Sequence, residues 1–398
     1  MGERTVTSGG EVLRELLAEG VSPWLDGLRR SLLTSGTLTR LVAAGRVRGA
    51  TTDPAALAAE VAGGTSYAQQ LCHLTCRSVP LTTAVQALCA YDLRTACDEL
   101  QPVFAATQGL DGHVSMDPVV HPGGCAGALA DSAVALHRAA CRPNALVKLP
   151  ATDAGLAAAG ECLARGIGVH VTGIFSVQRY EHVVEAWFEG LERARGAGLD
   201  LSVIPSVAGL PVARLDAEVD GLLRSAGAAP ELRGTAALAV ARLVYQRYEE
   251  GLGSARWRVL ASAGARPQRL MWSVGSGGSG GSAISGSSAV SGGSAIPATP
   301  GGSAGSGVPY VEALVAWGTV SALSSAALEA VVERGRLRGD TLTGQDGAAR
   351  AAVARLERCG VSFGEVAKRL EADSVAHEVS SWRGLRGAVA ARMRGGAE

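Results

Sequence analysis

Residues 142–152 read RPNALVKLPAT, an apolar run between Pro143 and Pro150 with a lysine, Lys148, inside it. This pattern predicts a short buried strand. The chain contains only two lysines, Lys148 and Lys368, so a lysine at this place is unusual. A lysine buried in a strand loses hydration, which lowers its pKa and favours the nucleophilic amine that forms a Schiff base with a carbonyl. The alternative is a strand-end lysine that reaches solvent or pairs with a carboxylate.

Other short segments have the same character, an apolar run that ends in polar residues. They are WLDG (24–27), VRGATTDP (47–54), HVSMDP (113–118), VHVTGIFS (169–176), SVAGLPVAR (206–214) and QRLMWSVG (268–275). Helical spacing of apolar residues marks the stretches between them, namely 28–44, 54–61, more than one helix in 67–107, 126–140, 153–164 and 177–197. The repeated order of strand and helix predicts a parallel sheet, and the strand count favours an α/β fold closed into a (β/α)8 TIM barrel.

The expected organisation has four parts. Residues 1–21 form an N-terminal extension, 22–274 hold barrel strands one to seven, 275–307 form a linker, and 308–398 hold the last strand and C-terminal helices. The linker is almost pure Gly, Ser and Ala, which predicts a mobile segment, either an active-site loop or a tolerated insertion. The eighth strand and its loop are expected within 310–323, followed by amphipathic helices at 326–335, 347–358, 362–372 and 375–393, without an independent C-terminal domain.

Composition excludes several classes of protein. The formal net charge is zero, which gives no electrostatic case for nucleic acid or an anionic membrane as a partner. Charged residues near the N-terminus leave no room for a signal peptide, and no apolar run is long enough to span a bilayer, so a soluble cytoplasmic protein is expected.

The eight cysteines are scattered along the chain. CHLTC (72–76) has the wrong spacing for a zinc ribbon, and buried small side chains are favoured there over a metal site.

Polar side chains stand at the ends of predicted strands one to five. They are Asp26, Asp53, Asp117, Lys148 and Thr172. Because catalytic groups in a barrel collect at the carboxyl ends of the strands, these side chains are expected to converge on one mouth. An amine, three carboxylates and a hydroxyl there would make a Schiff-base site with acid and base groups beside it. The structural alternative for each aspartate is a helix N-cap, which is the favoured prediction for Asp153.

In this order the segments resemble the transaldolase family, specifically the bacterial branch that ends in a set of helices. The resemblance also rests on LRGTAALAVARLVYQRYEEGL (232–252) and ARPQR (265–269), and it runs from about residue 22 to 268 and resumes weakly near Tyr310. It implies a last helix that packs across the barrel, and catalysis without metal or organic cofactor. By position, Lys148 would form the imine with the ketose donor and Asp26 would exchange a proton with a substrate hydroxyl. Thr172, with an acid on the third strand, would hold the water used in proton transfer at the imine carbon.

The chain departs from the family pattern at several positions. The third-strand acid is Asp117 where the family has Glu, and Asp53 stands where it has Asn. The Ser five positions before the phosphate-binding Arg is Gly209, although Arg214 itself is retained. With Arg214, the substrate contacts implied by the resemblance are Asp53 and Ser176. Burial of Lys148 and attraction to three carboxylates act on its pKa in opposite directions, which leaves its charge open.

Three hypotheses follow from these residues. The first and preferred one is a transaldolase of the pentose phosphate pathway, which transfers a three-carbon dihydroxyacetone unit between sugar phosphates. The second is a class I aldolase-like enzyme on a less phosphorylated carbonyl substrate, favoured by the altered phosphate side. The third is a non-catalytic relative, against which Lys148, Asp26 and Thr172 argue. The acceptor and the oligomeric state stay open.

Overall fold

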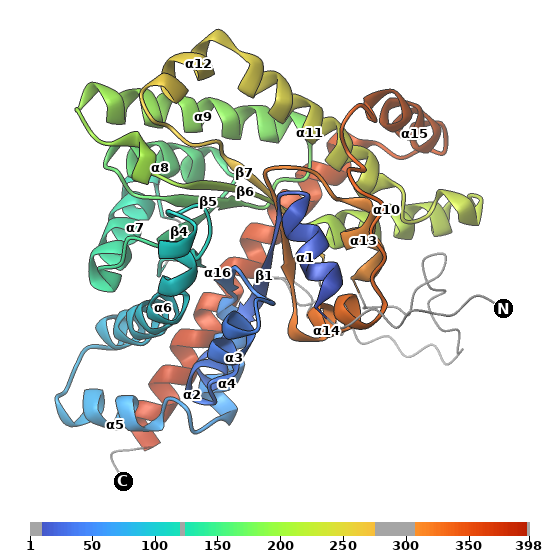
Figure 1. The fold of residues 1–398 in the computed structure, drawn as a ribbon. Helices are drawn as coiled ribbons and strands as arrows, with labels where there is room; N and C mark the ends of the chain where they lie inside the picture. The colour runs from blue at the N-terminus through green and yellow to red at the C-terminus, as the bar shows by residue number, and fades with distance from the viewer. Residues whose placement is uncertain (1–9, 120–123, 275–306, 396–398) are drawn as a thin grey trace, which may run out of the picture.

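Eight parallel strands form a closed barrel in the computed structural model, which describes residues 10–119, 124–274 and 307–395 (Figure 1). The strands pair in chain order, and β8 pairs with β1 to close the ring. They are β1 Val21–Leu28, β2 Gly49–Thr52, β3 Val114–Met116, β4 Ala145–Pro150, β5 Val169–Thr172, β6 Ser206–Leu210, β7 Arg269–Ser273 and β8 Thr319–Leu323. The predicted (β/α)8 barrel is confirmed, and each predicted segment overlaps one of these strands.

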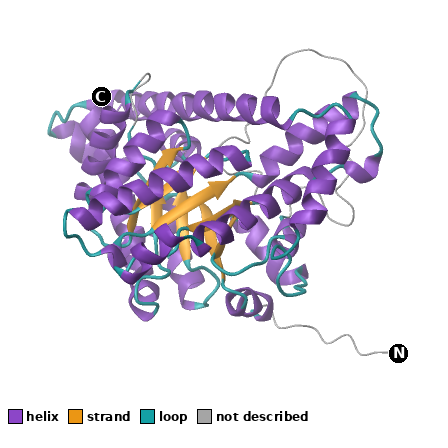
Figure 2. Cartoon of the chain, turned by 90° about the horizontal axis from the view of Figure 1, so that it is seen from above, coloured by secondary structure: helices purple, strands orange, loops and turns teal. Residues whose placement is uncertain are grey.

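Helices surround the strands on the outside of the barrel (Figure 2). They are α1 Glu11–Ala18, α2 Arg30–Thr34, α3 Thr37–Ala43, α4 Pro54–Gly63, α5 Ala68–Cys76, α6 Leu81–Ala106, α7 Ala126–Ala140, α8 Asp153–Ala164, α9 Val177–Gly196, α10 Val212–Ser225, α11 Ala236–Gly253, α12 Ala255–Ser262, α13 Val308–Ala313, α14 Ser325–Arg334, α15 Asp346–Arg358 and α16 Phe363–Gly395. The helix prediction for 126–140 and 153–164 matches α7 and α8 to the residue. In the described residues, no helix combines the length and apolar character needed to cross a membrane.

Two helix predictions were wrong in extent. The single helix expected at 28–44 is two helices, because Gly36 adopts a left-handed conformation with φ of 66° between α2 and α3. The two helices expected after residue 362 are one helix, α16, since no proline stands inside it. The eighth strand lies within 310–323 as predicted, and α13 precedes it, with Pro309 in the first helical turn that suits proline.

Two side-chain predictions were also wrong. The cap of α8 is Thr152, whose hydroxyl accepts from the Gly155 backbone N–H at 3.1 Å, and Asp153 is the first residue of the helix. Cys72 and Cys76 lie on α5 as expected, but both are exposed rather than buried. The linker prediction concerns residues 275–307, and apart from Gly307 that segment lies outside the described residues.

The lower part of the barrel interior is apolar. It is filled by Trp24, Leu146, Val207, Met271, Val320 and Ala322. Gly49 provides the space for the indole, because a Cβ at this position would lie 2.4 Å from the Trp24 ring. Strand residues alternate in direction, so the residues two positions after Trp24 and Leu146, which are Asp26 and Lys148, also face the interior, nearer the carboxyl ends. The apolar layer therefore supports a polar layer above it.

The long helix α16 crosses the carboxyl end of the barrel. It packs against α4, α5, α6 and α10, which belong to different parts of the ring. Figure 1 shows it in red behind the strands, and Figure 2 shows its length across the top of the view. Buried Trp382, Leu385 and Val389 anchor it. Its middle therefore lies next to the polar layer.

Candidate active site

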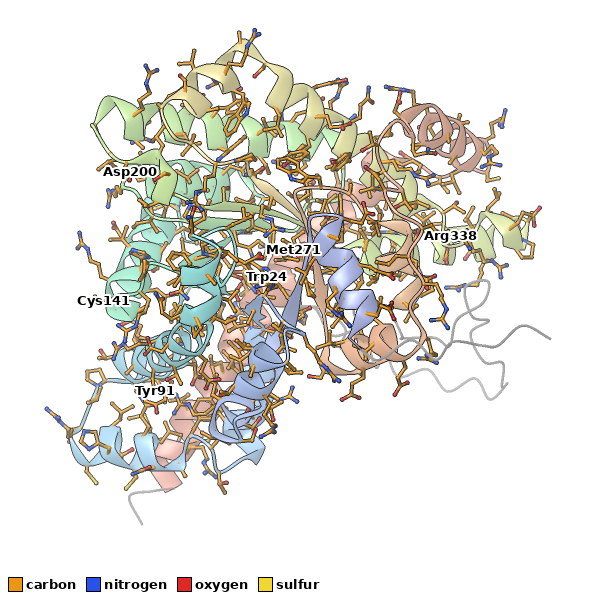
Figure 3. All side chains as sticks on the ribbon, in the orientation of Figure 1. Trp24, Tyr91, Cys141, Asp200, Met271 and Arg338 are labelled. Carbon is orange, nitrogen blue, oxygen red and sulfur yellow. The ribbon has the colours of Figure 1, made fainter. Side chains whose placement is uncertain are left out.

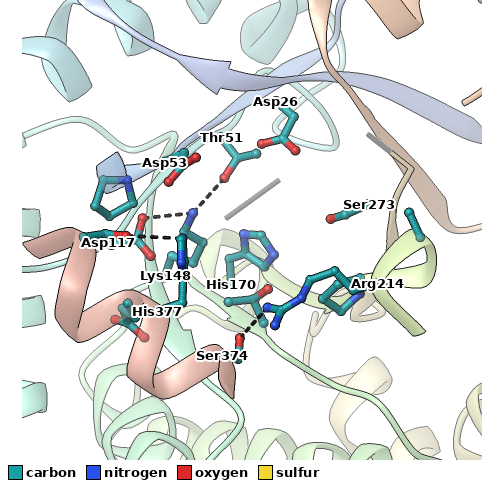
Figure 4. A pocket seen from close by; sticks show the side chains of 16 residues that line it. Asp26, Thr51, Asp53, Asp117, Lys148, His170, Arg214, Ser273, Ser374 and His377 are labelled. Carbon is teal, nitrogen blue, oxygen red and sulfur yellow. Dashed lines mark hydrogen bonds and ion pairs between the residues drawn. The ribbon is translucent and has the colours of Figure 1, made fainter. Parts of the chain in front are cut away.

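One cavity at the carboxyl ends of the strands contains most of the predicted site residues. Its lining includes Asp26, Asp53, Asp117, Lys148, Thr172 and Arg214. These residues come from β1 to β5 and from the start of α10, so the barrel topology brings together positions that are far apart in the sequence. Figure 4 shows the aspartates around the Lys148 side chain.

The Lys148 side chain is buried and held by three contacts. Its Nζ lies 2.9 Å from Asp117 Oδ2, 2.5 Å from the carbonyl oxygen of Thr52 and 3.4 Å from Thr51 Oγ1. Only 4% of the side chain is exposed. The expectation of a buried strand lysine is thus confirmed, and this lysine also pairs with a carboxylate, which the alternative prediction described.

The charge on Lys148 follows from two opposing effects. Burial by itself lowers the pKa of the amine, but attraction to Asp117, the hydrogen bond to it, and attraction to Asp26 and Asp53 together raise that pKa above its ordinary value. The sequence left the charge on Lys148 open, and the raised pKa favours the charged amine in the resting site. Burial raises the pKa of Asp117, although Lys148 acts against it. A proton therefore has a short path from the ammonium to a carboxylate that is ready to accept it.

The other two aspartates differ in environment. Burial, opposed by Lys148, raises the pKa of Asp26 to about 6, and the negative charge of Asp53 adds to the rise. Asp26 can therefore take up and release a proton near neutral pH. Asp53 accepts a hydrogen bond from the Ala55 backbone N–H at 2.9 Å and so caps α4. Asp53 thus has the structural role that an aspartate at this turn commonly has, and it also lines the cavity.

The predicted phosphate side is only partly present around Arg214. The Arg214 guanidinium donates to Ser374 Oγ at 3.5 Å and lies over the Phe175 ring, with 5.7 Å between Cζ and the ring centroid. Burial lowers the pKa of Arg214, with Asp373 acting in the opposite direction. Ser273, at the end of β7, also lines the cavity. One guanidinium and nearby hydroxyls are groups that can hold a phosphate.

Ser176 is placed differently from the other predicted residues. It is outside the lining of the cavity, and its hydroxyl accepts from the Arg179 backbone N–H at 3.1 Å as the N-cap of α9. A substrate contact by Ser176 stays a prediction.

Sequence reasoning missed the contribution of α16. Ser374, His377, Glu378 and Ser381 line the cavity on successive turns of this helix. The His377 ring nitrogen Nε2 lies 3.3 Å from Ser381 Oγ. Burial and the nearby charge of Asp117 raise the pKa of Glu378 to about 7, with Lys148 acting against the rise. The spacing of Ser374, Glu378 and Ser381 marks one helix face, but nothing in the sequence says which part of the barrel that face covers.

His170 on β5 was missed as well. It lines the cavity, is 2% exposed, and is the register partner of Lys148 on the neighbouring strand. Alternation along β5 could have found it, because His170 lies two residues before Thr172 and so faces the same side of the strand. In the described residues, no group of three or more His, Cys, Asp or Glu side chains is arranged to hold a metal ion.

Comparison with known proteins agrees with this geometry. The model of the Transaldolase/Fructose-6-phosphate aldolase family matches residues 23–389. Transaldolase 1 of Streptomyces avermitilis is 42% identical over 393 residues, which cover 98% of each chain. A transaldolase of Thermobifida fusca is 42% identical over 96% of this chain and 99% of its own, and one of Acidothermus cellulolyticus is 40% identical over 95% of both. With a barrel, a buried strand lysine and similarity along almost its full length, this chain belongs to the transaldolase/fructose-6-phosphate aldolase family.

Proposed function

We propose that this protein is a transaldolase that moves a three-carbon dihydroxyacetone unit from a ketose phosphate to an aldehyde acceptor through a Schiff base on Lys148. The observation that carries the proposal is the contact of Lys148 Nζ with Asp117 Oδ2 at 2.9 Å, inside a cavity that Asp26 and Thr172 also line. The relatives bear the name transaldolase, which supports the same reaction.

The first half of the reaction forms the imine. The Lys148 ammonium passes a proton to Asp117, and the free amine attacks the ketone carbon of the donor. The resulting carbinolamine loses its hydroxyl as water, which leaves the protonated imine. Thr172 and Asp117 line the same cavity and would hold this water and return the proton. Asp117 is shorter than Glu by one methylene, but its contact with Lys148 makes the first transfer direct.

The second half breaks and remakes a carbon–carbon bond. Asp26 takes the proton from the donor hydroxyl on the far carbon of the bond that breaks, so that this carbon becomes the carbonyl of the aldehyde product, which leaves. The electron pair of the broken bond moves to the iminium and forms an enamine on Lys148. An acceptor aldehyde then adds to this enamine, Asp26 returns its proton, and water releases the new ketose. Because the pKa of Asp26 is raised to about 6, this carboxyl is suited to both directions of transfer.

Arg214 is the proposed anchor for the substrate phosphate. It lines the cavity on the side of Ser374 and Ser273, so a ketose bound to Lys148 would extend its phosphate toward α10 and α16. Gly209 stands where the resemblance implies a serine, so a hydroxyl is missing beside His170 and Thr172, which predicts weaker substrate binding than a site with serine would have.

Reductive trapping tests the proposal directly. The protein is incubated with fructose 6-phosphate, sedoheptulose 7-phosphate or dihydroxyacetone, reduced with borohydride, and mapped by mass spectrometry. The expected adduct is on Lys148. Lys368 provides an internal control, because its side chain is 76% exposed and forms an ion pair with Glu365 at the surface. Adducts on Lys368 alone, or none at all, would overturn the proposal. If the protein releases free dihydroxyacetone from fructose 6-phosphate and does not transfer the three-carbon unit to erythrose 4-phosphate, the activity would instead be that of an aldolase.

A further inference from the structure

Glu378 on α16 is the fourth carboxyl that the described residues bring to the cavity wall, and the mechanism above gives it no part. It lies four residues before Trp382, so the two side chains share one face of the helix. The indole of Trp382 is 2% exposed, and the packing of α16 against α4, α6 and α10 holds the helix in place. The face that carries Glu378 is therefore turned toward the polar layer of the barrel.

The position of Glu378 along α16 sets it at the Schiff-base end of the cavity. Ser374, one turn earlier, accepts from the Arg214 guanidinium at 3.5 Å, which marks the proposed phosphate end. Four helical residues rise about 6 Å, so Glu378 lies that much further along the axis. Figure 4 shows Ser374 beside Arg214. It shows His377, which precedes Glu378 in the chain, on the side of Asp117.

The Glu378 carboxyl is free to contact a substrate. The residue is half-buried, and no hydrogen bond or ion pair to another described residue holds its oxygens. Burial and the charge of Asp117 raise its pKa to about 7, and Lys148 acts against the rise. At neutral pH about half of these carboxyls therefore carry a proton. The cavity thus contains a proton donor beside the reacting lysine near neutral pH.

The mechanism above needs such a donor at one step. The carbinolamine on Lys148 loses its hydroxyl as water only if an acid protonates the leaving oxygen. Asp117 Oδ2 lies 2.9 Å from Nζ, so Asp117 serves the nitrogen, whereas the hydroxyl is on the neighbouring carbon. Asp26 already exchanges the proton of a hydroxyl further along the sugar. A carboxyl on the helix that crosses the cavity offers a second direction of approach to the carbinolamine carbon.

We propose that Glu378 is a catalytic residue that donates its proton to the carbinolamine hydroxyl of the Lys148 adduct, so that this hydroxyl leaves as water. The carbon–oxygen bond breaks with its electron pair on oxygen, and the nitrogen lone pair closes the carbon–nitrogen double bond. Glu378 is left ionised, and the proton that Asp117 took from the ammonium reaches it through the released water, so no net proton is used. In the hydrolysis of the final imine the same steps run in reverse. The inference rests on the proposed function, since it names a further acid for the same reaction.

Other ionisable groups surround Glu378. Among the described residues, the other side chains of the cavity wall that carry or take up charge are Asp26, Asp53, Asp117, Lys148, His170, Arg214 and His377. Of the helices packed on α16, α10 contributes Arg214 and α4 contributes its cap Asp53, whereas no described residue of α5 or α6 is in the lining. Asp26 also exchanges a proton near neutral pH. A comparison of two proteins that differ only at Glu378 separates its contribution from those of the other groups.

The test measures how fast dihydroxyacetone forms an imine on Lys148. Excess cyanoborohydride reduces each imine as it forms, and mass spectrometry gives the rate of labelling on both sides of pH 7. In Glu378→Gln the rate below pH 7 is expected to fall by about 100-fold, a typical contribution of a general acid. The difference should shrink above pH 7, where the carboxyl of the unmodified protein is already ionised. Glu378→Asp keeps the acid and should recover part of the rate together with its pH dependence.

Glu371→Gln is the matched control on the same helix. Glu371 lies two turns before Glu378, is outside the cavity lining and pairs with Arg179, with 3.2 Å between Oε2 and Nη2. Its loss should leave the labelling profile unchanged. Melting temperatures of the three variants check that each one folds.

The outcomes separate the inference from the proposed function. The inference is overturned if Glu378→Gln slows labelling equally at every pH, or if Glu371→Gln has the same effect. It is also overturned if Glu378→Gln is labelled faster at high pH, because the carboxylate would then only hold the charge on Lys148. Equal rates in Glu378→Gln and the unmodified protein overturn the inference alone, whereas no adduct on Lys148 in the unmodified protein overturns the proposed function with it.

Discussion

Removing the carboxylate of Asp117 should change the pH at which Lys148 reacts. In Asp117→Asn the amine loses the ion pair with 2.9 Å between Nζ and Oδ2, whereas its burial is unchanged. At that distance, with an effective dielectric constant of about 20, the lost attraction is on the order of 6 kcal/mol before compensation by the remaining aspartates. The effect of burial is then larger than the remaining attraction to Asp26 and Asp53. The pKa of Lys148 therefore falls, and the free amine is present at lower pH.

The assay is the rate of reductive trapping of dihydroxyacetone on Lys148, measured by mass spectrometry at several pH values. The midpoint of the pH profile is expected to move to lower pH in Asp117→Asn. The maximal rate is expected to fall, because the residue that receives the ammonium proton is gone. These two readouts separate the charge effect from the loss of proton transfer.

A second buried ion pair provides the control. Arg30 Nε lies 2.5 Å from Asp92 Oδ1, outside the cavity lining, and both side chains are almost fully buried. In Asp92→Asn the guanidinium cannot lose its charge, so the protein should lose about 3–5 kcal/mol of stability without a change in the trapping profile. Asp117→Asn should cost less stability, since Lys148 can release its proton. A midpoint that stays fixed or rises in Asp117→Asn would refute this reasoning.

Three further outcomes are expected. Asp26→Asn should abolish cleavage of the carbon–carbon bond. The same change should stabilise the fold above pH 6 by about 3 kcal/mol, because the pKa of this carboxyl rises from 3.8 to about 6 on folding, and such a carboxyl opposes folding when it is ionised. Denaturant unfolding should show this gain shrinking as the pH falls from 6 toward 4, and a gain independent of pH would contradict it. Arg214→Leu should raise KM about 10- to 100-fold for fructose 6-phosphate but not for dihydroxyacetone, and equal effects on both would exclude a phosphate contact. Gly49→Ala should lower the melting temperature, because its Cβ would lie 2.4 Å from the Trp24 ring, and the free energy of unfolding should fall by about 1–3 kcal/mol or more. An unchanged melting temperature would show that the indole moves freely.

The sequence alone was enough to predict the barrel and much of the cavity lining. The strands are apolar runs that end in polar residues, and in a parallel barrel every such end lies at the same mouth. Asp26, Asp117, Lys148 and Thr172 could therefore be placed together from their positions at strand ends, before any distance was known. The resemblance to transaldolases added roles to these positions, and the comparisons confirm the family.

Only the tertiary structure decided the charge on Lys148 and the rest of the cavity wall. The pKa of the amine depends on the difference between burial and attraction to Asp117, and that difference is set by distances which no spacing in the sequence encodes. Glu378 reaches the cavity because α16 crosses the barrel, a contact between segments more than two hundred residues apart. The His170 ring contacts Ser115 on β3 and lies close to Gly209 on β6, so its surroundings come from two other strands. Sequence patterns indicate which face of a helix or strand is polar, whereas packing between distant elements decides which residues that face contacts.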